Sequence, residues 1–182
     1  MSVTAIVVAI IVVAAVAVAF WLYSQRRRST ELREQFGPEY DRTVREYGDS
    51  RRAERNLEER AERVEKLHIQ PISPERSARY TEEWRRVQAQ FVDAPDEAIA
   101  QADRLVIEVM QTRGYPMGNF EQRAADISVE HPQVVEHYRA AHAIADRSSR
   151  HEATTEDVRQ AMVHYRALFE ELIETREPAG RR

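Results

Sequence analysis

The histidines are the side chains whose chemistry best suits metal or heme binding, because the chain has six of them and no cysteine. His137 and His142 are five positions apart, whereas two ligands on one helix need a spacing of three or four. His142 and His164 would have to meet across two helices, and His131 precedes Pro132 at an expected helix entry. We expect no metal and no cofactor. A metal- or heme-binding bundle that uses His131, His142 or His164 stays an alternative.

The sequence has no recognisable catalytic motif. It contains neither GxSxG nor HExxH, so its Ser, His and Asp residues lack a typical nucleophile setting. Asp103 lies one position from an apolar stripe, and Arg139 follows the core-facing Tyr138, which favours a structural ion pair between two helices. The sequence therefore predicts a protein that is not an enzyme.

One glycine-containing segment, TRGYPMGNF (112–120), could form a binding loop. It lacks the GxGxxG spacing and no strand precedes it, so a phosphate-binding role is not expected. We expect Gly114 to end a helix and the following tyrosine to fold onto the domain. The alternative is a loop that binds a protein partner. Its contact residues would be Tyr115, Pro116, Met117 and Phe120.

The elements that carry these residues are all expected to be helices. Tyr80, Trp84, Val87 and Phe91 recur at spacings of four, three and four, which predicts one buried helical stripe. Capping residues predict where further helices begin, and no strand-like alternation competes with them. The fold class is therefore all-α, with a small helical bundle over 71–176 and a flexible tail over 177–182. The predicted helix starts are Pro74 after Ser73, Pro95, Asn119, the segment after EHPQ, and Thr154 or Thr155.

Residues 26–70 are expected to form a charged helical stalk or linker. Twelve of the 18 residues of Asp49–Lys66 are charged, and Glu59–Arg63 and Glu62–Lys66 are favourable i,i+4 pairs. The apolar seam is narrow, so a solvated stalk is favoured, while a coiled coil that forms a homo-oligomer stays an alternative. Pro71 and Pro74 then end the helix, which predicts a domain boundary there.

Residues 1–25 carry no charged side chain and are expected to anchor the protein in a membrane. Val3 to Tyr23 is 21 residues long, and a helix of that length spans about 30 Å, the thickness of the hydrocarbon core. Phe20, Trp21 and Tyr23 lie where an interfacial aromatic belt is expected. A single transmembrane helix is therefore predicted.

The arginine triplet Arg26, Arg27 and Arg28 predicts the orientation of this anchor. Positive residues flank the cytoplasmic side of a span, so the N-terminus is expected outside and the C-terminal domain in the cytoplasm, at the plasma membrane. Three basic residues are too few to predict specific lipid binding beyond headgroup contact. The segment Ala17–Ala19 also fits a small-x-small cleavage site, which keeps a secreted or extracytoplasmic domain as an alternative.

Three segments of the chain resemble a family of uncharacterised bacterial proteins that are labelled only as hypothetical, membrane or secreted proteins. They lie within Trp84–Ile173 and contain WRRVQAQFVDAPDEAIAQADRLVIEVM, FEQRAADISVEHPQVVEHYRAAHAI and TTEDVRQAMVHYRALFEELI. The resemblance implies an N-terminal anchor joined to a helical module, and implies no catalytic residue. Net charge is −4 with no large basic block, so no nucleic-acid partner is expected. The expected function is a membrane-tethered, non-catalytic module that binds an unknown protein partner.

Overall fold

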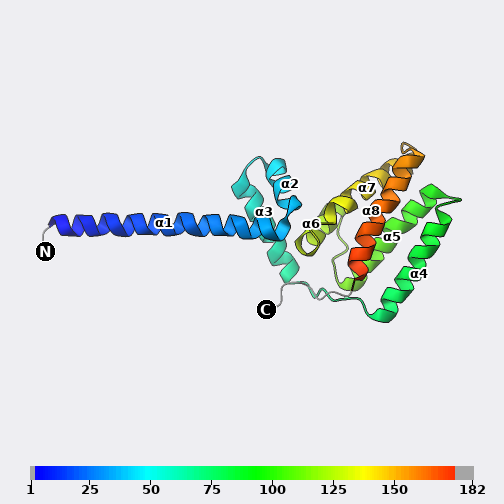
Figure 1. The fold of residues 1–182 in the computed structure, drawn as a ribbon, viewed down its shortest axis with the longest axis horizontal. Helices are drawn as coiled ribbons and strands as arrows, with labels where there is room; N and C mark the ends of the chain where they lie inside the picture. The colour runs from blue at the N-terminus through cyan, green and yellow to red at the C-terminus, as the bar shows by residue number, and fades with distance from the viewer. Residues whose placement is uncertain (1–2, 175–182) are drawn as a thin grey trace. The chain divides into compact units, whose positions relative to one another are not determined.

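The computed structural model describes residues 3–174, and the side chains of 11–174 apart from Leu22 and Gln25. The predicted tail 177–182 lies outside the described residues. All regular structure in the described part is α-helical, which confirms the all-α prediction (Figure 1). The helices are α1 (Val3–Phe36), α2 (Pro38–Tyr47), α3 (Ser50–Glu65), α4 (Pro74–Gln90), α5 (Pro95–Arg113), α6 (Phe120–Glu130), α7 (Val135–Ser149) and α8 (Thr155–Ile173).

Local capping residues determine where three helices begin. The side chain of Ser73 accepts a hydrogen bond from the Arg76 amide, and Asn119 accepts one from the Gln122 amide over 2.8 Å. Thr154 forms a complete capping box with Asp157 at the start of α8. The predicted starts of α4, α6 and α8 are thus confirmed.

The chain divides into two compact units, Met1–Leu57 and Glu58–Arg182. In the first unit α1 packs against α2, and Gly37 and Gly48 take positive φ angles of 48° and 66° at the two ends of α2. Its buried apolar side chains are Leu32, Phe36, Tyr40, Ala53 and Leu57.

In the second unit α5 packs against α4, α7 and α8, and α7 and α8 pack against each other (Figure 1). Trp84 is only 5% exposed and stacks on Phe169 with ring centroids 4.8 Å apart, which confirms the inward direction of its stripe. Val64, Ile69 and Ile72 belong to the same core. Residues 58–70 of the predicted stalk therefore lie in one compact unit with the bundle helices, because Val64 and Ile69 pack into its hydrophobic core.

Gly114 closes α5 at a point where another segment of backbone passes close by. Its φ of 102° is left-handed, and a Cβ atom on it would lie 2.6 Å from the carbonyl oxygen of His68. The Gln70 amide donates to the Arg113 carbonyl over 2.8 Å in the same place. Only glycine combines this φ with this close approach.

Candidate functional site

Between Ile11 and Tyr23, α1 exposes a series of apolar side chains. From residue 11 onward, the large ones are between 55% and 72% exposed. They are Ile11, Val12, Val13, Val16, Val18, Phe20, Trp21 and Tyr23. Exposed apolar surface on this scale is typical of segments that bind a membrane or another protein.

Among the side chains that the structure describes, no helix has an apolar stretch long enough to cross a membrane. The predicted span Val3 to Tyr23 includes residues 3–10 and Leu22, whose side chains lie outside the described set. The transmembrane anchor therefore stays a prediction.

The arginine triplet lies on α1 directly after this apolar surface. Arg27 Nε donates to Glu31 Oε1 over 2.8 Å, and both side chains are well exposed. Thr30 Oγ1 donates to the Arg26 carbonyl over 3.0 Å. An exposed i,i+4 ion pair of this kind contributes only about 0.3–0.5 kcal/mol. All three arginine side chains are exposed.

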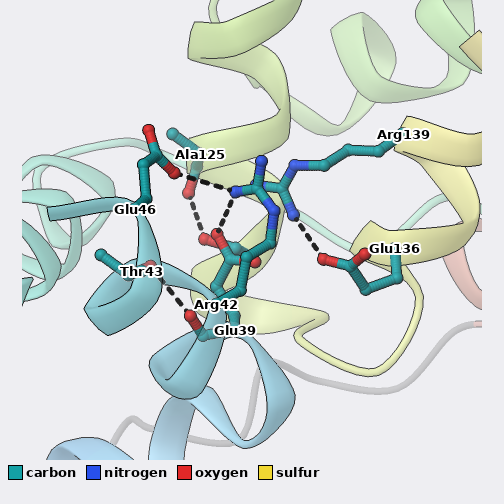
Figure 2. Close-up of polar contacts among 8 residues, drawn as sticks. Glu39, Arg42, Thr43, Glu46, Ala125, Glu136 and Arg139 are labelled. Carbon is teal, nitrogen blue, oxygen red and sulfur yellow. Dashed lines mark hydrogen bonds and ion pairs between the residues drawn. The ribbon is translucent and has the colours of Figure 1, made fainter. Parts of the chain in front are cut away.

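Within α2, Arg42 lies between two glutamates (Figure 2). Its Nη1 is 3.3 Å from Glu46 Oε2 and 3.7 Å from Glu39 Oε1, and the Glu39 side chain is fully buried. Thr43 Oγ1 donates to the Glu39 carbonyl over 2.8 Å. These contacts join neighbouring turns of one helix and give Glu39, Arg42 and Glu46 a structural role.

The predicted binding loop after Gly114 is only partly available at the surface. Tyr115 is 3% exposed, and its hydroxyl donates to Glu130 Oε2 over 2.5 Å. Phe120 stacks on His142 with ring centroids 3.8 Å apart. Pro116 and Met117 are exposed. Of the four candidate contact residues, the structure therefore presents two outward and uses two to hold the loop.

A group of buried and part-buried polar side chains surrounds the C-terminal end of α5. We call it the α5-end cluster: Arg113, Tyr115, Glu130, His131 and Glu171. Arg113 is 2% exposed, donates to the Leu172 carbonyl over 3.1 Å and lies 3.9 Å from Glu130. His131 Nδ1 is 2.9 Å from Glu171 Oε1. The cluster ties α6 and α8 to the end of α5.

The surroundings of this cluster change how its members titrate. Burial, together with the Glu130 carboxylate, raises the pKa of the Tyr115 phenol, which therefore stays a hydrogen-bond donor. Burial lowers the pKa of His131, although the hydrogen bond with Glu171 opposes this effect. The ring is thus disfavoured as a cation at neutral pH.

Close to this cluster, α3 and α6 are joined by a buried carboxylate. Asp126 is fully buried, and its Oδ1 accepts from Arg63 Nε over 2.9 Å and from Gln122 Nε2 over 2.8 Å. The contact joins residues 63 positions apart in the chain. It fixes the end of the charged helix α3 to α6 within the second unit.

A second polar group lies between α5, α7 and α8 around Asp103. Asp103 Oδ1 accepts a hydrogen bond from the Tyr165 hydroxyl over 2.8 Å and lies 3.9 Å from His142 Nδ1. Burial opposes ionisation of Asp103, but the nearby His142 ring and the Tyr165 hydrogen bond lower its pKa. We expected Arg139 to pair with Asp103. Arg139 instead donates to Glu136 over 3.0 Å (Figure 2).

The two histidines that the structure brings together are not His142 and His164, the pair that the sequence analysis considered. His164 meets His137, with the two Nδ1 atoms 2.9 Å apart, whereas His142 stacks on Phe120. Among the described side chains, no group of three or more His, Cys, Asp or Glu is placed to hold a metal ion.

Arg113, Asp126 and Glu171 were not predicted as site residues, although the sequence pattern carries a signal for Arg113 and Asp126. Arg113 continues the Val106, Val109, Met110 stripe of α5, and Asp126 adjoins the buried Ile127 on α6. A charged residue on a buried helical face predicts a buried partner. No pattern in the sequence identifies that partner.

Comparisons with protein-family models, curated proteins and solved structures gave no match to this chain.

Proposed function

We propose that this protein is a single-pass membrane protein whose helical bundle faces the cytoplasm and acts by binding another protein, without catalysis. The observation that carries the proposal is the uncharged stretch Val3 to Tyr23 followed directly by three arginines. A helix of this length matches the hydrocarbon core of a bilayer.

The exposed apolar side chains of α1 support the anchor. A Val, Ile or Phe side chain gains about 1.5–3 kcal/mol when it leaves water, and all eight large apolar side chains described between Ile11 and Tyr23 are more than half exposed in the isolated chain. Insertion in a bilayer removes this surface from water. The backbone is already hydrogen-bonded within α1, as a bilayer requires.

The charge asymmetry across the stretch supports the orientation. Arg26, Arg27 and Arg28 follow it directly, whereas the residues printed before it, Met1 and Ser2, are not basic. Basic residues resist translocation, whereas acidic residues contribute little to topology. The acids of α2 and α3 therefore do not cancel the effect of the triplet.

A binding role for the bundle is supported by the way its polar residues are used. Asp126, Arg113, His131 and Asp103 each form a hydrogen bond to a residue of another helix, as in a scaffold. The exposed tip of the 114–119 loop, Pro116 with the 40% exposed Met117, is the surface that we propose for partner contact. Exposed loop residues held by a rigid support are typical contact sites.

Orientation is tested with the full chain carrying alkaline phosphatase or a fluorescent protein after Arg182. We expect fluorescence and no phosphatase activity in the parent. In a variant with Arg26, Arg27 and Arg28 changed to Gln, and with Ser2→Lys and Thr4→Lys, a fraction of the phosphatase should become active. Phosphatase activity in the parent, or a parent chain cut after Ala19 in the medium, would contradict the cytoplasmic placement.

A further inference from the structure

The two histidines that meet between α7 and α8 form an arrangement that the proposed function does not use. His137 Nδ1 and His164 Nδ1 are 2.9 Å apart, and the ring centroids are 5.1 Å apart with an interplanar angle of 35°. One ring comes from each of two helices that pack directly against each other. The two nitrogens therefore face each other from independent backbone supports.

This distance requires one Nδ1 to donate a proton and the other to accept it. Both rings cannot carry a positive charge at this separation without strong repulsion. Burial, and the repulsion that the neighbouring His137 ring would exert on a second positive charge, lower the pKa of His164, so the His164 ring is disfavoured as a cation at neutral pH. A neutral imidazole is the form that binds a metal ion.

The spacing also fits one shared ion. Two nitrogens bound to a tetrahedral Zn²⁺ at about 2.0–2.1 Å lie about 3.3 Å apart, which is close to the present separation of 2.9 Å. Small rotations of the two side chains supply the difference. Both residues are part-exposed, so water can reach the remaining coordination positions.

We propose that His137 and His164 bind a divalent transition-metal ion, Zn²⁺ or a similar borderline ion, through their two Nδ1 atoms. The ion takes the place of the hydrogen bond between the rings. The ring that donates from Nδ1 changes to the tautomer protonated on Nε2, its proton passing through solvent, and the accepting ring already carries its proton on Nε2, so both rings bind as neutral ligands. Two water molecules complete a tetrahedral shell. With only two protein ligands, the site is an exchangeable one that bridges α7 and α8, and the fold does not depend on it.

The experiment uses the full chain in non-ionic detergent, purified without a polyhistidine tag and stripped with a chelator that is then removed. Calorimetric titration with ZnCl₂ at pH 7.5 should give saturable binding of one ion per chain. His137→Ala and His164→Ala should each abolish it. His68→Ala, which removes an exposed histidine outside the pair, should leave it unchanged.

Two further measurements keep the result interpretable. Circular dichroism checks that each variant is folded, and His137→Gln and His164→Gln supply polar replacements where alanine destabilises the bundle. Affinity should fall as the pH drops from 7.5 to 5.5, because protons compete with the metal ion for the imidazole nitrogens. Absence of saturable binding in the parent, binding retained in folded His137→Gln and His164→Gln, or one ion per two chains would each overturn the proposal.

Discussion

His131 follows the last residue of α6 and belongs to the α5-end cluster. Three helices present charged groups to its ring. Glu171 on α8 and Glu130 on α6 favour the protonated ring, and Arg113 on α5 opposes it. Burial is the largest effect, and the pKa of His131 is lowered. The ordinary pKa of a histidine is about 6.5. When the pH is lowered through this value, the unfolded chain binds a proton on His131 that the folded chain resists. The free energy of unfolding therefore decreases as the pH is lowered from about 6.5.

We predict that His131→Asn reduces this loss. The Asn amide can still donate to Glu171 but does not titrate, so the melting temperature of the variant should decline less than that of the parent between pH 7.5 and 5.5. His164 also has a lowered pKa and is present in both proteins, so the difference between them isolates His131. Thermal melts followed by near-ultraviolet circular dichroism measure it. Equal declines in the two proteins would mean that His131 titrates normally.

At the scale of elements, the end of α5 depends on Gly114. The Cβ of an alanine there would lie 2.6 Å from the His68 carbonyl oxygen at a φ of 102°. The left-handed conformation alone costs an L-residue about 1–2 kcal/mol, and the backbone contact adds to it. We predict that Gly114→Ala lowers the unfolding free energy by more than about 2 kcal/mol.

Gly118→Ala is the matched control for this prediction. It lies in the same loop and its φ is not left-handed. A Cβ atom there meets the Gln122 side chain and no backbone, with Cγ at 3.1 Å and Cβ at 3.2 Å, so a shift of a few tenths of an ångström is enough to accommodate it. The control should stay within about 0.5 kcal/mol of the parent in urea unfolding, as surface substitutions usually do. Similar losses in both variants would show that the close approach of residues 68 and 114 is not important for stability.

The packing of α4 on α8 depends on Trp84, which stacks on Phe169. We predict that Trp84→Ala costs about 3–5 kcal/mol, as for other large core side chains. Trp84→Phe keeps a ring against Phe169, and the indole Nε1 has no hydrogen-bond partner among the described atoms, so this variant should lose much less. Urea unfolding monitored by circular dichroism compares them. A Trp84→Ala variant as stable as Trp84→Phe would rule out a stabilising role for the stacked ring.

For the whole molecule, the proposed membrane anchor gives the strongest single prediction. Val12 lies near the middle of the predicted span, and an arginine there costs about 2.5–3.5 kcal/mol on the insertion scale. Val12→Arg should therefore move protein out of the carbonate-resistant membrane fraction. Val92→Arg is the control, because Val92 is 82% exposed on the other unit and should not affect fractionation. Membrane association unchanged in Val12→Arg would contradict the span.

The elements themselves could be predicted from the sequence because the forces that form them are local. Ser73, Asn119 and Thr154 satisfy amide groups within three residues, and Gly114 takes a conformation that ends a helix. The 3.6-residue period likewise places Tyr80, Trp84 and Val87 on one inward face. Neither type of information depends on a distant part of the chain.

The partners across helices were decided only by the tertiary structure. Periodicity states which face of a helix is buried, but it does not specify how far one helix slides or turns against the next. His164 therefore meets His137 and not His142, and Asp103 takes Tyr165 as its partner where Arg139 was expected. A shift of one helical turn, about 5.4 Å, is enough to exchange such partners. The sequence determines the helices and their inward faces, and the packing of those faces determines which polar groups meet.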